Sequence, residues 1–172
     1  MQIFITGFMG AGKSYLGKEL AKLLGFGFVD LDELVEAQME MPVTEIFRQF
    51  GEPAFRQLEA ECLRSLGDKK QLVVATGGGA PCFFENMQWM NENGVTVHFY
   101  APTKLLVQRL SSEKANRPLL AGLSDADLEA YVESKVAERS PFYELCHLQF
   151  TVPAEGFQGI EVLSNYLGRF FT

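Results

Sequence analysis

The chain has 172 residues, of which 47% are hydrophobic and 22% are charged, and its formal net charge at pH 7 is −7. This composition is typical of a soluble globular protein, and the length suits one domain (1–172) but not two ordinary ones. The negative charge argues against nucleic acid as the main partner, because proteins that bind it carry clustered lysines and arginines.

Neither a membrane nor an oxidising compartment is indicated. No apolar stretch is long enough to cross a bilayer, and the N-terminus lacks the pattern of a secretory signal. Cys62, Cys82 and Cys146 are far apart and the chain has only two histidines, so neither a disulfide framework nor a zinc site is indicated. We therefore expect a cytoplasmic monomer without a membrane partner.

Short apolar runs alternate with segments that have helical periodicity. The runs, which predict five strands, are Ile3–Thr6, Phe26–Val29, Leu72–Thr76, Val95–Tyr100 and Leu148–Val152. Several are apolar almost throughout, which is typical of strands covered on both faces, and the segments between them are long enough for crossover helices. The sequence therefore predicts an α/β domain with a parallel sheet.

The first helix is predicted after the first strand. Leu16, Leu20, Leu23 and Leu24 have the spacing of one helical face, and Gly25 stands where a left-handed C-terminal cap belongs.

A glycine-rich stretch, Gly7 to Ser14 with the sequence GFMGAGKS, leads into this helix. Its spacing of Gly7, four residues, Gly12, Lys13 and Ser14 is that of a phosphate-binding loop between strand and helix. Backbone N–H groups and the helix N-terminus attract phosphate, Lys13 reaches the β- and γ-phosphates, and the Ser14 hydroxyl can bind Mg²⁺. A simple turn would need neither the lysine nor the serine. No Asn-Lys-x-Asp motif for guanine follows, which favours ATP.

Two carboxylates, Asp30 and Asp32, end the second predicted strand. Ligands collect at the carboxyl ends of parallel strands, so both should face the same crevice as the phosphate loop. One could serve Mg²⁺ and the other a hydroxyl group. Helix capping explains them equally well, because Asp30 with Glu33 makes a plausible capping box and Asp32 could stabilise the helix start. Their spacing does not choose between these interpretations.

A helix is predicted over 51–63, with Arg56 outside its apolar stripe and therefore free to meet an anion. The alternative partner is Glu52 one turn earlier, an i,i+4 pair worth only about 0.3–0.5 kcal/mol when exposed.

The third strand ends in three glycines, Gly77 to Gly79, which cost entropy unless the backbone must approach a ligand closely. Arg139 precedes Pro141, where the helix should end.

Six motifs, in order, resemble those of the shikimate kinases. They are Gly-x-Met-Gly-x-Gly-Lys-Ser, Asp-x-Asp, Gly-Glu-x-x-Phe-Arg-x-x-Glu, Gly-Gly-Gly, Arg-Pro-Leu-Leu and Arg-x-x-x-Tyr, spread from Gly7 to Tyr143. The resemblance implies a three-layer sandwich with strand order 2-3-1-4-5. It also implies phosphoryl transfer from ATP, with Mg²⁺, to the 3-hydroxyl of shikimate.

The resemblance also implies roles for individual residues. It assigns catalysis to Lys13, Asp32 and Arg117, and nucleotide binding to Gly10, Ala11, Gly12, Lys13, Ser14, Tyr15 and Arg117. Shikimate would contact Asp32, Arg56, Gly77, Gly78, Gly79 and Arg139, and Mg²⁺ would contact Ser14 and Asp30. The segment 31–61 would bind shikimate, and residues 111–122 would form a lid over ATP.

Two other functions remain open at this point. A kinase for another small polyhydroxy acid, such as gluconate, could use a similar loop and lid, although Arg56, Arg139 and the three glycines disfavour it. A binding module that has lost catalysis is disfavoured by the presence of Lys13, Ser14, Asp32 and Arg117.

Overall fold

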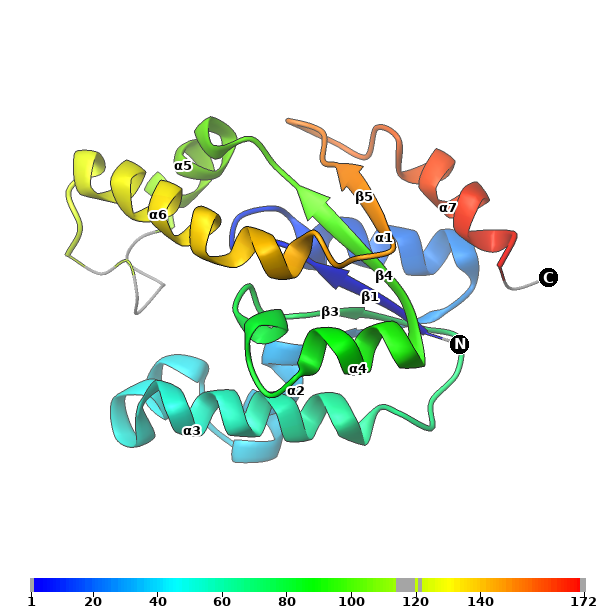
Figure 1. Ribbon diagram of the computed structural model, residues 1–172, viewed down its shortest axis with the longest axis horizontal. Coiled ribbons are helices and arrows are strands. Elements are labelled where there is room, and N and C mark those ends of the chain that lie inside the picture. The colour runs from blue at the N-terminus through cyan, green and yellow to red at the C-terminus, as the bar shows by residue number, and fades with distance from the viewer. Residues whose placement is uncertain (1, 114–119, 121, 171–172) are drawn as a thin grey trace.

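The computed structural model describes residues 2–113, 120 and 122–170. The elements, shown in Figure 1, are β1 (Gln2–Thr6), α1 (Lys13–Leu24), β2 (Gly27–Asp30), α2 (Leu31–Met39), α3 (Val43–Ser65), β3 (Leu72–Ala75), the 3₁₀ turn η1 (Ala80–Cys82), α4 (Asn86–Asn93), β4 (Gly94–Tyr100), α5 (Thr103–Ser111), α6 (Asp125–Tyr143), β5 (Leu148–Thr151) and α7 (Ile160–Gly168). Each of the five predicted strands is present within two residues of its expected ends.

The strands form one parallel sheet in the order β2-β3-β1-β4-β5, which confirms the predicted order. In the register, Ile3 of β1 lies between Val73 of β3 and Val95 of β4. Strands β2 and β3 lie on one side of β1, and β4 and β5 lie on the other. In open α/β sheets, ligands bind in the crevice beyond the carboxyl ends of the strands where the chain changes from one side to the other. This topology places the phosphate loop, which follows β1, in the middle of that edge.

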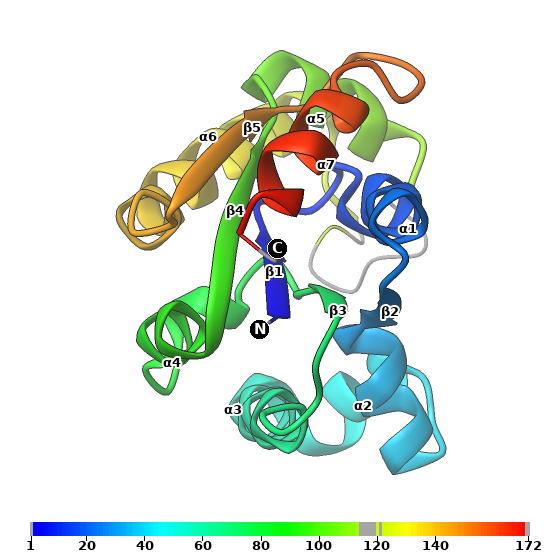
Figure 2. The ribbon, with the colours of Figure 1, turned by 90° about the vertical axis from the view of Figure 1, so that its right-hand side faces the viewer.

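Helices cover both faces of the sheet, with α1 and α7 on one face and α3, α4 and α6 on the other (Figures 1 and 2). Successive side chains of the central strand β1 point to opposite faces of the sheet, so they pack into two separate hydrophobic cores. Ile3 and Ile5 pack with Leu20 of α1, whereas Phe4 packs with Leu63 of α3 and Met90 of α4. A strand that is buried on both faces has no polar side, which explains the continuous apolar run.

The turns at the two ends of α1 depend on glycine. Gly12 caps the N-terminus of α1 with φ 84°, and Gly25 caps its C-terminus with φ 69°, as predicted. Gly7, at the start of the phosphate loop, has φ 138°, and a Cβ there would lie 2.5 Å from the carbonyl oxygen of Phe99. The backbone of the loop therefore passes against β4 in a way that only glycine permits.

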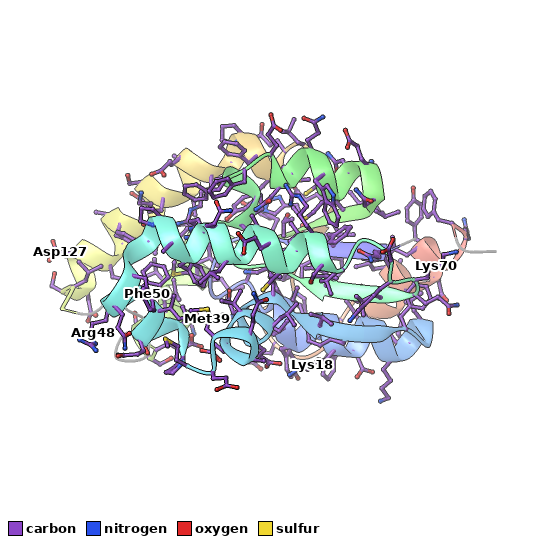
Figure 3. All side chains as sticks on the ribbon, turned by 90° about the horizontal axis from the view of Figure 1, so that it is seen from below. Lys18, Met39, Arg48, Phe50, Lys70 and Asp127 are labelled. Atoms are coloured by element: carbon purple, nitrogen blue, oxygen red, sulfur yellow. The ribbon has the colours of Figure 1, made fainter. Side chains whose placement is uncertain are left out.

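The helix predicted over 51–63 is the second half of a longer element. In α3 the backbone breaks at Gly51, with φ 78° and ψ 172°, and restarts with Pro53, whose missing N–H is tolerated in a first turn. Figure 3 shows Phe50 beside this break and Lys70 beyond the other end of α3.

The helix α6 does not end at Pro141 as expected but continues to Tyr143. The Ser140 hydroxyl donates a 2.8 Å hydrogen bond to the carbonyl of Val136 in this last turn. Tyr143 is buried, and its hydroxyl is bonded to the backbone of Gly78, so tertiary contacts hold the turn after the proline.

None of the helices in the described part of the chain combines the length and the apolar character that crossing a membrane requires.

Candidate active site

A cleft of about 710 Å³ opens at the carboxyl edge of the sheet. Its walls come from the phosphate loop, the end of β2, the glycine turn after β3 and the segment after β5. Among the predicted site residues, the lining includes Gly10, Gly12, Lys13, Ser14, Tyr15, Asp30, Asp32, Gly77 and Gly78. Residues far apart in the sequence therefore meet around one space, as the topology requires.

The phosphate loop contributes one of the cations that line the cleft, Lys13. The Lys13 ammonium group donates hydrogen bonds to the carbonyls of Gly7, at 2.8 Å, and of Phe8, at 3.0 Å. Ala11, a predicted nucleotide-binding residue, is buried in the core and does not line the cleft. Tyr15 is 57% exposed and stacks on Phe157, with 4.6 Å between ring centroids.

Asp30 contacts the starts of two helices, and one of these contacts is the cap that the sequence allowed. Its Oδ1 accepts hydrogen bonds from the backbone N–H groups of Asp32, at 3.0 Å, and of Glu33, at 3.4 Å, which caps α2. Its Oδ2 accepts a hydrogen bond from the Ser14 hydroxyl. The carboxylate therefore joins the first turn of α1 to the start of α2.

Asp32 lines the cleft and is not the capping residue of α2. It belongs to the first turn of α2, and its side chain points to the glycine turn. A Cβ added to Gly77 would lie 3.0 Å from Asp32 Oδ1. The structure thus separates the two aspartates, with Asp30 on the phosphate-loop side and Asp32 beside the turn after β3.

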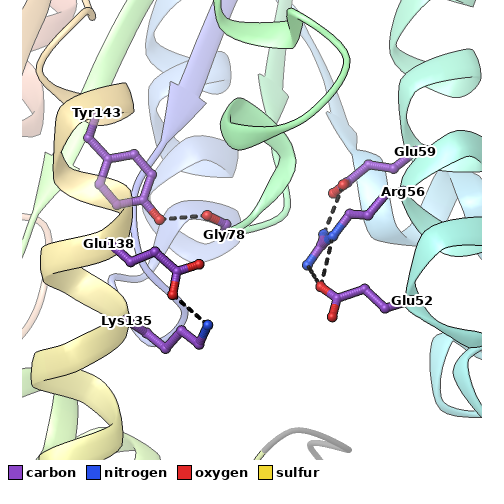
Figure 4. A network of polar contacts seen from close by, with 7 residues as sticks. All are labelled: Glu52, Arg56, Glu59, Gly78, Lys135, Glu138 and Tyr143. Carbon is purple, nitrogen blue, oxygen red and sulfur yellow. Dashed lines mark hydrogen bonds and ion pairs between the residues drawn. The ribbon is translucent and has the colours of Figure 1, made fainter.

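Arg56 is not on an exposed face, as the sequence had suggested, but only 4% exposed. Its Nε and Nη2 donate to Glu52 Oε1, at 3.2 and 2.9 Å, and its Nη1 donates to Glu59 Oε2 at 2.9 Å (Figure 4). The expected Glu52 partner is present, and Glu59 is a second one that we did not anticipate. The rings of Phe55 and Phe83 also face the guanidinium, with their centres 5.2 and 5.0 Å from its carbon.

The three glycines are needed for close approach, because none of them has a positive φ. A Cβ on Gly77 would collide with Glu59 Oε1, and one on Gly79 would lie 2.5 Å from Arg56 Nη2. A Cβ on Gly78 would lie 3.4 Å from Arg139 Nη1. The turn therefore leaves space for four charged side chains, two carboxylates and two guanidinium groups.

Arg139 is buried on α6, with its guanidinium carbon 5.4 Å from the centre of the Phe8 ring. Neither Arg139 nor Arg56 lines the main cleft among the described residues, yet both approach the glycine turn that does. The two arginines reach this turn from α6 and α3, which cover the same face of the sheet.

Sequence reasoning missed Arg109 and the segment after β5. Arg109 Nη1 donates to the carbonyl of Gly10 at 3.0 Å, and its Nη2 donates to the carbonyls of Pro153 and Ala154, at 3.0 and 2.9 Å. Arg109 therefore joins the phosphate loop to the segment 153–156, and both line the cleft. No motif marks this arginine, although a long polar side chain in the last turn of α5 was visible in the sequence.

Arg117 and most of the predicted lid (111–122) lie outside the residues that the structure describes.

Comparison with known proteins identifies the family. A family model described as shikimate kinase matches residues 9–164. The chain belongs to the shikimate kinase family. Shikimate kinase from Parabacteroides distasonis is 42% identical over 149 residues, covering 87% of this chain and 86% of that protein.

Solved structures of the shikimate kinase family agree with the fold. The crystal structure of shikimate kinase from Bacteroides thetaiotaomicron has a TM-score of 0.90 at 37% identity and covers 99% of this chain and 98% of its own. Shikimate kinase from Acinetobacter baumannii in complex with shikimate has a TM-score of 0.86 at 33% identity, with coverages of 99% and 92%.

The protein is thus an enzyme of the shikimate kinase family, and its reaction is the ATP-dependent phosphorylation of shikimate. It serves the pathway to aromatic amino acids. The family excludes the two alternatives that the sequence had left open, a gluconate kinase and a binding module without catalysis.

Proposed function

We propose that the ATP phosphates bind at Gly10–Ser14 and that shikimate binds beyond them, between Asp32 and the two buried arginines. The single observation that carries this proposal is the glycine turn, which faces the phosphate loop on one side and Arg56, Arg139 and Asp32 on the other. The phosphate loop attracts the triphosphate, and a pair of guanidinium groups suits a carboxylate.

The nucleotide base then extends toward Tyr15 and the segment 153–156. This direction follows by elimination, because the opposite wall is formed by Asp32, Gly77 and Gly78. Arg109 stabilises the wall that the base would contact, since its guanidinium binds two carbonyls of the segment. Arg117 keeps its sequence-based assignment to catalysis and nucleotide binding.

In this arrangement Asp32 orients the 3-hydroxyl of shikimate and accepts its proton. The hydroxyl oxygen forms the new bond to the γ-phosphorus while the bond from that phosphorus to the ADP oxygen breaks. Phosphoryl transfer passes through a loose transition state, so positioning and charge neutralisation contribute most of the rate acceleration. Lys13 supplies positive charge to the phosphoryl oxygens.

The oxygen atoms beside the phosphate loop fit Mg²⁺. The Ser14 hydroxyl and the Asp30 carboxylate lie within hydrogen-bond reach of each other, and Mg²⁺ prefers oxygen ligands. The described residues contain no cluster of three or more His, Cys, Asp or Glu side chains that could hold a metal. This agrees with Mg²⁺, which is held by one or two protein oxygens together with phosphates and water. When bound, the ion would neutralise phosphate charge.

The role of Asp32 is tested by Asp32→Asn, with Asp30→Asn as the matched variant. Asparagine keeps the shape and loses the charge. If Asp32 takes the proton, kcat falls by about 10²–10⁴ while shikimate still binds. If Asp32 only positions the hydroxyl, the shikimate Kd rises together with the loss in rate. Near-normal kcat and Kd would remove Asp32 from the site, because asparagine caps helices as well as aspartate does.

The choice of acceptor is tested by ADP release with shikimate, with gluconate and with no acceptor. Release that depends on shikimate alone supports the proposal. A preference for gluconate, or no release with either acid, would contradict it. We also propose that the protein is a cytoplasmic monomer. Sedimentation of the purified protein would check the monomeric state.

A further inference from the structure

Glu59 is a carboxyl group fully enclosed by protein, with an exposed fraction of 0%. Its Oε2 accepts the 2.9 Å hydrogen bond from Arg56 Nη1 (Figure 4). Its Oε1 has no hydrogen-bond partner among the described residues and points to the backbone of Gly77. A buried carboxyl with an unsatisfied oxygen is costly, and such a group calls for an explanation.

Several charged groups face Glu59 from different elements. Arg56 shares its helix, Asp32 comes from α2, and Arg139 comes from α6. Glu52 binds the same guanidinium from the exposed side of α3. These five groups are three carboxyl groups and two guanidinium groups, so the cluster carries one net negative charge when all of them are ionised. Two thiols, Cys62 of α3 and Cys82 of η1, lie close enough to feel the charge of Glu59.

Arg56 is therefore already paired with two carboxylates before any substrate binds. Its contacts with Glu52 and Glu59 use three of its five N–H bonds and compensate its charge twice. The carboxylate of shikimate would bring one more negative charge to a cluster that already has an excess. Charges that are taken out of water need compensation nearby, so the substrate anion would be opposed by Glu59.

A proton on Glu59 removes this opposition without moving any side chain. The proton would bind Oε1, and Oε2 would continue to accept from Arg56. The two N–H bonds of Arg56 that contact neither glutamate can then bind the substrate carboxylate, and the charge of the guanidinium is no longer offset by Glu59. The position of Oε1 beside Gly77, on the side where Asp32 Oδ1 also lies, favours protonation because the two carboxylates repel each other.

We propose that Glu59 is a substrate-recognition residue that carries a proton in the shikimate complex, so that the shikimate carboxylate and one proton bind together. This inference rests on the proposed placement of the shikimate carboxylate at Arg56 and Arg139. The proton comes from solvent and is returned when the product leaves, so the balance of the phosphoryl transfer is unchanged.

The environment of Glu59 in the free protein supports the proposal. Burial raises the pKa of Glu59 to about 7, against the lowering effect of Arg56 and with a further rise from Asp32. The group is therefore ready to bind or release a proton near neutral pH. Linkage is reciprocal, so a proton that strengthens shikimate binding must itself be bound more tightly in the complex.

The proton uptake can be measured directly by calorimetry of shikimate binding at pH 8, without nucleotide, in buffers of different ionisation enthalpy. We expect the wild-type protein to take up about one proton per shikimate, and its Kd to rise up to about tenfold per pH unit above neutrality. Glu59→Gln keeps the hydrogen bond to Arg56, takes up no proton, and has a Kd that is independent of pH.

Glu52→Gln is the matched control, because it alters the other partner of Arg56 at a position that is 42% exposed. This variant should keep the proton uptake. A wild-type heat that does not depend on the buffer would overturn the proposal, and so would uptake that persists in Glu59→Gln. If Glu59→Gln fails to fold, the wild-type measurement still decides.

A third variant, Arg139→Ala, separates this inference from the proposed site. If Arg139→Ala weakens shikimate binding but the wild type takes up no proton, the site stands and the role of Glu59 is wrong. If both Arg139→Ala and Glu59→Gln bind shikimate like the wild type, the placement of the substrate carboxylate is itself wrong.

Discussion

The Tyr143 hydroxyl donates a 2.5 Å hydrogen bond to the carbonyl of Gly78, which ties the end of α6 to the glycine turn after β3 (Figure 4). Arg139 lies one turn earlier on the same helix and is thereby held beside that turn. The tyrosine ring also stacks on His98 of β4, with 4.9 Å between ring centroids. Tyr143 thus positions the arginine that we assign to the shikimate carboxylate.

Removing that hydroxyl should loosen the position of Arg139. Tyr143→Phe leaves the Gly78 carbonyl without its donor, which costs about 1–3 kcal/mol of stability. We expect the shikimate KM to rise several-fold while the ATP KM stays unchanged, as measured by steady-state kinetics. Tyr166→Phe, on the exposed face of α7, is the control and should change neither KM. Equal increases for both substrates would contradict a positioning role.

Lys13→Ala should abolish most of the activity without unfolding the protein. The lysine donates to two loop carbonyls and belongs to neither hydrophobic core, so the fold should survive its removal, whereas the reaction needs its charge at the phosphoryl oxygens. We expect kcat to fall by about 10²–10³ or more at an unchanged melting temperature. Lys18→Ala, on the exposed side of α1, should have wild-type kcat. A wild-type rate in Lys13→Ala would overturn the assignment of the phosphate loop.

Arg139→Ala should raise the shikimate KM about 10–100-fold and leave the ATP KM nearly unchanged, because hydrogen bonds to charged groups contribute about 1.5–3 kcal/mol. Arg48→Ala, an exposed arginine of α3, is the control. Arg56→Ala is less informative, because it would leave Glu59 buried without its cation and destabilise the fold by about 3–5 kcal/mol. An equal effect of Arg139→Ala on both substrates would contradict the assignment.

Gly79→Ala should impair shikimate binding through a steric effect on Arg56. The new Cβ would lie 2.5 Å from Arg56 Nη2, so the guanidinium must move away from its present position. We expect a higher shikimate Kd by calorimetry. Gly168→Ala adds the same methyl group in α7, where no atom lies within 4 Å, and should bind shikimate normally. Normal binding by Gly79→Ala would show that the position of Arg56 is not critical.

Stability should fall as the pH rises through neutrality, because of Glu59. Its pKa in the folded protein is about 7, above the usual 4.5, so between these values the folded state holds a proton that the unfolded chain has lost. The stabilising contribution is complete below the unfolded pKa and disappears as the pH passes 7. The unfolding free energy of the wild type, relative to Glu59→Gln, should drop by on the order of 2 kcal/mol from pH 5 to pH 8 in urea titrations. A constant difference would be inconsistent with a raised pKa.

The sequence by itself determined the features that depend on neighbouring residues. The phosphate loop is eight consecutive residues whose glycines, lysine and serine act through local backbone geometry, so their spacing was sufficient to predict it. The strands were visible because burial on both faces leaves a continuous apolar run. The cap on α2 was also predictable, since Asp30 bonds to residues only two and three positions away.

The tertiary structure alone decided which side chains are buried together. Arg109 bonds to Gly10 across 99 positions, and Tyr143 bonds to Gly78 across 65 positions. The same long-range packing buried Arg56 with Glu59, although helical periodicity had placed the arginine on a free face, and it extended α6 past Pro141. Periodicity reports which face of one helix is apolar, but the burial of a charge depends on what other elements bring to it. That information is distributed over segments far apart in the chain, and folding brings them together.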